Sequence, residues 1–353
     1  MRFELQSGRA LLVSGPASLM VEKGSAEILG APLHPKHGVV IKKEKQLPIE
    51  TVEDSVLEAR LGERASYLEI DGTTIPESWY AAVEAFKSLG RGRAFVLGSA
   101  DTGKSTFCTF LTNHMIKAGA EVSVVDADIG QSDLGPPGTV GLSIIKRPMT
   151  ALEYAGVYRM AFVGETSPSP VTERVIESIV KVADRAPEDI PMVINTDGWI
   201  TDGDAVTFKV RMIRRLMPDL IIGLAERDEL DEILDATTVP SVKIQVPKYV
   251  KARGREERRR LREYGYRRYL RGAVHKNIFL ERVKIDGLLK ARCKGKELLG
   301  FLDSDGLLLG IGILESLIRR RKILRAYTNV SSREVAEIDC GRIRLSCRGE
   351  ELD

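Results

Sequence analysis

The chain has 353 residues, more than one ordinary hydrophobic core contains, so we expect two or three domains. Hydrophobic residues make up 43%, charged residues 29%, the net charge is +3, and no apolar run approaches the roughly 20 residues of a membrane span, so we expect neither a membrane protein nor a membrane partner. The N-terminus MRFELQSGRALLVSG lacks the order of a signal peptide, and the four cysteines lack CxxC spacing. These features predict a cytoplasmic protein with buried thiols and neither a zinc site nor a disulfide framework.

The first predicted elements are short strands. Residues 1–85 hold alternating apolar and polar runs separated by Gly and Pro turns, which predicts a small N-terminal β domain. A helix over ESWYAAVEAFKSLG then leads to the strand RAFVLG, a helix over 104–117 and a second strand, EVSVVDAD. From residue 86 onward the pattern is therefore that of an α/β domain.

The same alternation continues along the chain. Helices are expected near 172–183 and over 204–216, and strands at PMVINTD, DLIIGLA and SVKIQV. The pattern predicts a parallel sheet with helices on both faces over residues 86–285, with ligands at the carboxyl ends of its strands. Residues 286–353 return to strand-like runs, which predicts a small C-terminal β domain.

A phosphate-binding loop lies between the first strand and helix of the α/β domain. The pattern GxxxxGK(S/T) is matched by Gly98, Ser99, Ala100, Asp101, Thr102, Gly103, Lys104 and Ser105, and Thr106 adds a second hydroxyl. Glycines turn backbone N–H groups toward phosphates, the lysine reaches the β and γ oxygens, and the serine ligates magnesium. The fold class is therefore an α/β P-loop NTPase. The loop alone does not choose the acceptor, and the absence of NKxD and LSGGQ signatures leaves a kinase or an unusual ATPase.

Two carboxylates and an amide follow the second strand of this domain in the stretch DADIGQ. Asp126 and Asp128 end an apolar run and should lie at the same sheet edge as the phosphate loop, pointing the same way because they are two residues apart. Asp126 and Asp128 are both expected within reach of the metal. One carboxylate can hold Mg²⁺ through its water shell, and the other can accept the proton of an attacking hydroxyl. A lone aspartate here would be explained as a turn cap, but a pair beside a phosphate loop favours chemistry.

Three spaced motifs together resemble one known family. The phosphate loop, the DADIGQ stretch followed by LGPPGT, and Asn195-Thr196-Asp197-Gly198-Trp199 are similar to motifs of the polynucleotide 5'-hydroxyl kinases. That family includes the RNA-processing kinase subunit of the eukaryotic pre-mRNA cleavage and polyadenylation machinery. Its members have an N-terminal β domain, a P-loop kinase domain and a C-terminal β domain in this order.

The resemblance implies a role for each matching residue. It makes Lys104, Ser105 and Thr106 binders of ATP and magnesium, Asp128 the general base, and Gln131 a contact to the acceptor end or the metal shell. Asp126 is left with a role in the metal shell by elimination. The family's clasp for the nucleic-acid end falls on Thr196, Gly198 and Trp199. Threonine can bond a phosphate, glycine permits close approach and tryptophan offers a stacking face, although a buried structural tryptophan is the alternative.

Positive charge is concentrated in residues 251–272, which hold ten Lys or Arg, three Glu and three Tyr. This composition suits single-stranded nucleic acid, but it also suits a solvated helix with Glu–Arg pairs. The family has an arginine lid with RxxxR spacing, and three pairs fit: Arg255 with Arg259, Arg258 with Arg262, and Arg267 with Arg271. We prefer Arg258 and Arg262. The run RRRK at 319–322 is explained equally well by RNA contact and by charge that protects a strand edge.

The combined prediction is an ATP-dependent polynucleotide 5'-hydroxyl kinase. It would transfer the γ-phosphate of ATP to the 5'-OH end of RNA, with single-stranded DNA as a second candidate acceptor, in RNA processing or repair. ATP and Mg²⁺ or another divalent cation are the expected cofactors. A non-catalytic ATP-binding scaffold and a P-loop NTPase switch remain as alternatives. No motif names the residues that contact adenine.

Overall fold

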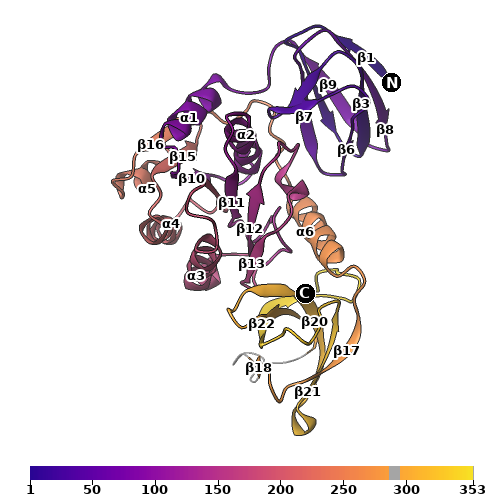
Figure 1. Ribbon diagram of the computed structural model, residues 1–353, viewed down its shortest axis with the longest axis vertical. Helices are drawn as coiled ribbons and strands as arrows, with labels where there is room; N and C mark the ends of the chain where they lie inside the picture. The colour runs from indigo at the N-terminus through magenta and orange to yellow at the C-terminus, as the bar shows by residue number, and fades with distance from the viewer. Residues whose placement is uncertain (286–294, 353) are drawn as a thin grey trace.

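The computed structural model describes residues 1–285 and 295–352 (Figure 1). The N-terminal part consists of nine strands: β1 Arg2–Leu5, β2 Ala10–Ser14, β3 Ala17–Lys23, β4 Ala26–Ile28, β5 Ala31–Leu33, β6 Gly38–Ile41, β7 Gln46–Thr51, β8 Ser55–Leu61 and β9 Ser66–Ile70. They form two antiparallel sheets with strand orders β1-β8-β3-β6 and β5-β4-β7-β2-β9. Each sheet buries one face, as the alternation in β3 of buried Ala17, Leu19 and Val21 with more exposed residues requires.

The central part alternates helices and strands. Its elements are α1 Glu77–Ser88, β10 Arg93–Gly98, α2 Lys104–Lys117, β11 Val122–Asp126, β12 Thr139–Ile145, η1 Leu152–Tyr154, β13 Arg159–Phe162, η2 Ser169–Val171, α3 Thr172–Ala183, β14 Met192–Asn195, α4 Gly203–Leu216, β15 Leu220–Leu224, α5 Asp231–Asp235, β16 Ser241–Ile244 and α6 Arg255–Tyr269. The helices predicted over 104–117 and near 172–183 are confirmed as α2 and α3. The helix predicted from residue 204 is α4.

These strands form one seven-stranded sheet in the order β13-β12-β11-β14-β10-β15-β16. The strands from β11 to β16 in this order are parallel, while β12 and β13 are added antiparallel at one edge, so the predicted parallel sheet is in fact mixed. Helices cover both faces because successive strand residues point to opposite sides. In β10, Val96 packs with α1 and α2, whereas Phe95 and Leu97 pack with α3 and α4.

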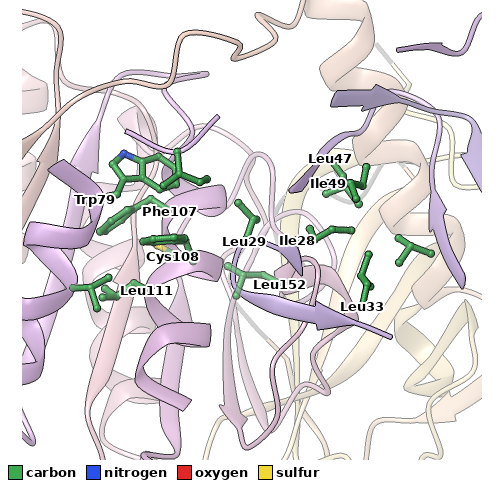
Figure 2. Close-up of a cluster of buried hydrophobic side chains, with 14 of the residues drawn as sticks. Ile28, Leu29, Leu33, Leu47, Ile49, Trp79, Phe107, Cys108, Leu111 and Leu152 are labelled. Atoms are coloured by element: carbon green, nitrogen blue, oxygen red, sulfur yellow. The ribbon is translucent and has the colours of Figure 1, made fainter. Parts of the chain in front are cut away.

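The N-terminal sheets are joined to the central part by a continuous apolar core. Figure 2 shows Ile28 and Leu47 of these sheets on one side, Trp79 and Phe107 of α1 and α2 on the other, and Leu29 and Leu152 between them. All of these side chains are nearly or completely buried. Burial of these apolar side chains holds the N-terminal sheets against α1 and against α2, the helix that follows the phosphate loop.

The C-terminal part contains β17 Val274–Phe279, β18 Lys284–Ile285, β19 Glu297–Leu302, β20 Leu308–Ile318, η3 Arg319–Arg321, β21 Ile323–Thr328 and β22 Glu337–Arg344. They form a six-stranded sheet in the order β17-β21-β20-β19-β22-β18. The predicted domain boundary at residue 286 lies outside the described residues. Hydrogen bonding of β17 to β21 and of β18 to β22 places both strands, which the sequence assigned to the central domain, in this sheet.

Two further expectations concern the chain as a whole. Within residues 1–285 and 295–352, no helix is both long and apolar enough to cross a bilayer. Cys108 and Cys340 are buried and Cys347 is partly buried, all as free thiols, while Cys293 lies outside the described residues.

Candidate functional site

The phosphate loop joins the end of β10 to the start of α2. Its sharp turn depends on Gly98, where a Cβ would lie 2.8 Å from the Leu224 carbonyl oxygen, and on Gly103, which has φ of +90°. The Lys104 ammonium is almost buried and donates to the Ser99 carbonyl oxygen at 2.6 Å. Burial lowers the pKa of Lys104, against the attraction of Asp128. A triphosphate would give this lysine stronger acceptors than a neutral carbonyl.

The loop opens into a cavity of about 540 Å³. Ala100, Asp101, Gly103, Lys104, Ser105 and Thr106 line it. Gly98, Ser99 and Thr102 shape the loop from behind, and the Thr102 hydroxyl donates to the Ser99 carbonyl at 2.9 Å. A cavity of this size, with a phosphate loop on one wall, can enclose a nucleotide and the end of a second substrate.

Asp126 is completely buried at the end of β11 and does not line the cavity. One of its oxygens accepts backbone N–H groups of Asp133 and Leu134 at 2.6 and 3.1 Å, and the other accepts the Asn195 amide at 3.0 Å. Burial, followed by repulsion from Asp133 and Asp128, raises the pKa of Asp126 to about 7.

Asn195 connects Asp126 to the phosphate loop, a role that the sequence interpretation missed. Its amide nitrogen also donates to the Ser105 hydroxyl at 3.1 Å, while its Oδ1 is buried without a hydrogen-bond partner. The available signal was a polar residue at the end of the apolar run PMVI, because β14 pairs in parallel with β11 and puts Asn195 beside Asp126. Ser105 therefore offers a hard oxygen donor of the kind that Mg²⁺ takes at the cavity, with Asn195 and Asp126 bonded behind it.

Asp128 occupies a different position from Asp126. Strand β11 ends at Asp126, so strand alternation does not extend to Asp128, and the expectation that both carboxylates point the same way is wrong. Asp128 lines the cavity, and its Oδ1 accepts the backbone N–H groups of Gly130 and Gln131 at 3.0 and 2.9 Å. Burial, then the charge of Asp197, raises the pKa of Asp128, while Lys104 opposes the shift. Gln131 also lines the cavity and donates to the Arg258 carbonyl at 3.3 Å.

The clasp residues divide into structural and cavity-facing groups. Thr196 is completely buried and its hydroxyl donates to the Val96 carbonyl at 2.7 Å, so its predicted phosphate contact is corrected to a bond from the residue after β14 to β10. Gly198 approaches the phosphate loop itself, because a Cβ there would lie 2.4 Å from the Ala100 nitrogen. Trp199 lines the cavity, stacks at a tilt on Phe208 and donates its indole N–H to Asp202 at 2.7 Å.

A buried ion pair, also missed from sequence, supports this clasp. The Lys209 ammonium is fully buried on α4 and lies 2.6 Å from Asp197, whose other oxygen accepts the Trp199 backbone N–H at 2.9 Å. The signal was a lysine inside the apolar face of a predicted helix. Such a lysine requires a buried acidic partner.

The basic stretch forms α6, which crosses the cavity. Of the three RxxxR pairs that the sequence left open, only Arg258 and Arg262 line the cavity. Arg258 pairs with Asp101 of the phosphate loop at 2.6 Å, and Arg262 binds Glu351 through two nitrogens at 2.5 and 2.7 Å. The alternative of a solvated helix with Glu–Arg pairs applies to a different side of α6, where Arg259 and Arg267 form ion pairs with Glu263.

One wall of the cavity is apolar, and no sequence motif predicted it. Its residues come from the N-terminal sheets, the region around the start of α1 and the segment after β16. Leu12, Leu47, Ile75 and Tyr249 line the cavity together with Trp79, whose buried indole donates to the Gln245 carbonyl at 3.0 Å. These residues come from distant parts of the chain. An apolar wall in the same cavity as a phosphate loop is suited to bind the base of a nucleotide.

Comparisons with known proteins find relatives over most of the chain. A family model described as mRNA cleavage and polyadenylation factor CLP1 P-loop matches residues 98–272. The chain is 26% identical over 336 residues to the polyribonucleotide 5'-hydroxyl-kinase of Pyrococcus abyssi, with 79% of this chain and 95% of the relative covered. It is 29% identical over 337 residues to the polyribonucleotide 5'-hydroxyl-kinase of Pyrococcus horikoshii, with 79% and 93% covered.

More distant proteins share the fold or part of the sequence. The human polynucleotide 5'-hydroxyl-kinase NOL9 is 28% identical over 160 residues, which is 43% of this chain and 23% of that protein. The solved wild-type Clp1p–Pcf11p complex has a chain that superposes with a TM-score of 0.77, covering 98% of this chain and 97% of that chain at 14% identity. This structural likeness shows that the fold is shared.

Proposed function

Because the chain belongs to the polynucleotide 5'-hydroxyl kinase family related to CLP1, we propose that it transfers the γ-phosphate of ATP to the 5'-OH end of RNA. One observation carries the proposal: Lys104, Asp128 and Arg258 line the same cavity, from three separate elements. They supply a phosphate binder, a base and a lid cation. Single-stranded DNA with a 5'-OH end is the second candidate acceptor, since none of these groups reads the 2'-OH.

The nucleotide would bind across the phosphate loop. Backbone N–H groups and Lys104 hold the β and γ phosphates, while the wall of Leu47, Ile75 and Trp79 receives the adenine ring. Lys104 has to exchange the Ser99 carbonyl for phosphate oxygens as ATP enters. The lysine is therefore already in place, and its own loop holds it until the phosphate arrives.

Asp128 would receive the proton of the 5'-OH group. Its Oδ1 is held by two backbone N–H groups, which fixes the carboxylate in orientation at the cavity wall. A raised pKa makes the carboxylate a stronger base than an exposed aspartate, provided that it is ionised. The deprotonating oxygen then attacks the γ-phosphorus in line with the leaving β-phosphate oxygen.

Charge on the transferring phosphoryl group would be balanced by Lys104 and the lid arginines. Arg258 is placed by its bond to Asp101 in the phosphate loop, while Arg262 has to leave Glu351 before it can contribute. Ser105 would hold Mg²⁺ directly, and Asp126 and Asn195, which lie behind it, would act through the water shell of the ion. When bound, Mg²⁺ supplies neutralisation of the phosphate charge.

The alternatives from sequence have less support. A non-catalytic scaffold would tolerate a damaged loop or a missing base, whereas Lys104, Ser105 and Asp128 are all present at the cavity. An NTPase switch that acts on a protein would have no use for a cavity that extends from the phosphate loop to Trp199 and α6.

The test is transfer of labelled γ-phosphate from ATP to RNA and DNA oligonucleotides with 5'-OH ends. Transfer is expected to RNA, with the same oligonucleotide carrying a 5'-phosphate as the blank. The Asp128→Asn variant serves as the matched protein control, because it keeps the shape of the side chain and loses the base. ATP binding without transfer to either acceptor by the wild-type protein would refute the proposal.

A further inference from the structure

One side of the sheet in the C-terminal part is covered next to α6 and, within the described residues, is open farther along β17 and β21. In β17 and β21, Ile278, Leu324 and Ala326 point into the core of the sheet, so Asn277, Phe279 and Arg325 lie on the opposite side. Close to α6 this side is covered, because Tyr327 packs against a cluster that includes Tyr266 and Leu270. Farther along it is open, and Phe279 is 67% exposed, more than any other aromatic side chain of the described residues.

Three cationic side chains lie at the end of this surface that is farthest from α6. Arg320, Arg321 and Lys322 form the exposed turn between β20 and β21, and the backbone N–H of Leu280 bonds to the Lys322 carbonyl at 2.8 Å, which puts the turn next to Phe279. Within the part of the chain that the structure describes, these three cations have no ion-pair partner. We call Asn277, Phe279, Arg320, Arg321, Lys322 and Arg325 the β17–β21 surface.

The charge of this region is far from the average of the chain. Residues 274–285 and 315–325 hold eight Lys or Arg and two Glu, a local net charge of +6, whereas the whole protein carries +3. Positive charge by itself could serve to keep other strands from pairing with β17, since β17 lies at the edge of the sheet. An exposed phenylalanine works against that protection, because it offers an apolar contact to any strand that docks.

The sheet that carries this surface is fastened to α6, a helix that lines the cavity. Tyr264, Arg268 and Tyr269 of α6 line the cavity, and the chain passes directly from the end of α6 into β17. Asn329, just after β21, donates to the carbonyl oxygens of Tyr269 and Arg271 at 3.0 and 3.1 Å and so fastens this end of the sheet to α6. Figure 1 shows β17 and β21 extending from α6 toward the end of the molecule opposite the N-terminal sheets.

We propose that the β17–β21 surface binds the single-stranded RNA that follows the 5'-terminal nucleotide held in the cavity. Arginines and Lys322 contact the backbone phosphates, and Phe279 stacks on a base, the combination that binds single strands without reading their sequence. A six-residue strand such as β17 is about 20 Å long, enough for several nucleotides. The inference rests on the proposed kinase function and extends its substrate from an RNA end to an RNA strand.

The experiment compares acceptors of two lengths. The variants are Phe279→Ala and the pair Arg320→Ala with Arg321→Ala, and the matched control is Arg214→Ala with Arg215→Ala, two exposed arginines at the far end of α4. Each protein phosphorylates 5'-OH RNA of about four and of about twenty nucleotides, lengths chosen below and above the site size of a typical single-strand binder. An unchanged rate on the short RNA shows that each variant is folded.

The surface variants should raise the KM for the long RNA about tenfold and leave the short RNA and the KM for ATP unchanged. The double arginine variant should also reduce the slope of log affinity for the long RNA against log salt by about 1.4, two phosphates at about 0.7 each. An unchanged KM for the long RNA, or equal effects in the Arg214 and Arg215 control, would overturn the inference and leave the surface for a protein partner. Absence of transfer to either RNA by the wild-type protein would instead count against the kinase function.

Discussion

Replacement of Lys209 by Met is expected to destabilise the protein strongly. The Lys209 side chain is 0% exposed and that of Asp197 is 7% exposed, with their charged atoms 2.6 Å apart. Methionine matches the length of lysine but leaves the Asp197 carboxylate buried without the ammonium that bonds to it. Breaking a buried pair in this way costs about 3–5 kcal/mol of unfolding free energy. That is a large part of the roughly 5–15 kcal/mol that a domain has in total.

The measurement is chemical denaturation of the wild type, Lys209→Met, and the double variant Asp197→Asn with Lys209→Met. The double variant removes both charges, and its Asn side chain can still accept the Trp199 backbone N–H that Asp197 accepts at 2.9 Å. It should recover most of the lost stability, since neutral replacements of buried pairs are often tolerated. A loss below about 1 kcal/mol in Lys209→Met would refute the reasoning, because the carboxylate would then be solvated or neutral without its lysine.

Three more outcomes are expected. Asp128→Asn should lower the transfer rate by roughly 10²–10⁴-fold, the usual worth of a general base, with the ATP dissociation constant little changed in a filter-binding assay. Gly198→Ala should weaken ATP binding and cost about 1–3 kcal/mol of stability, because the new Cβ would lie 2.4 Å from the Ala100 nitrogen; equal ATP affinity in calorimetry would contradict this. The pKa of Asp126 is raised to about 7 from an ordinary value of 3.8, so the folded state binds more protons than the unfolded state between these pH values. Its contribution to stability therefore falls as pH rises from about 4 to 7, and melting curves of the metal-free wild type should show a decline across this window that is smaller in Asp126→Asn.

The arginines of α6 illustrate how much residue spacing alone can predict. Three RxxxR pairs fit the pattern equally, because residues four apart share a helix face whatever that face contacts. Only the packing of α6 over the cavity selects Arg258 and Arg262. The same packing engages Arg262 with Glu351, a residue 89 positions later in the chain that no helical pattern could have linked to it.

The clasp shows a second limit of sequence. Thr196, Gly198 and Trp199 stand within four residues at the end of a strand, and their types alone suit a phosphate, a close approach and a base. The structure turns the Thr196 hydroxyl to the Val96 carbonyl and packs Gly198 against the phosphate loop, and Gly198 and Trp199 both line the cavity. Which partner a short polar side chain finds depends on the neighbouring strand, and that neighbour is set by topology.

The sequence by itself determined the features that depend on local order. Local sequence predicts the phosphate loop, helices α2 and α3 and the acidic stretch at the end of β11. The signals are the positions of glycines and the spacing of apolar residues, every second residue in strands and every 3.6 residues in helices, and a short segment is enough to show them. Only the tertiary structure decided the antiparallel edge of the sheet, the difference between buried Asp126 and cavity-facing Asp128, and the apolar wall around Trp79. Those features arise from contacts between segments far apart in the chain. Side-chain burial and strand pairing determine which segments come into contact, and local propensity does not.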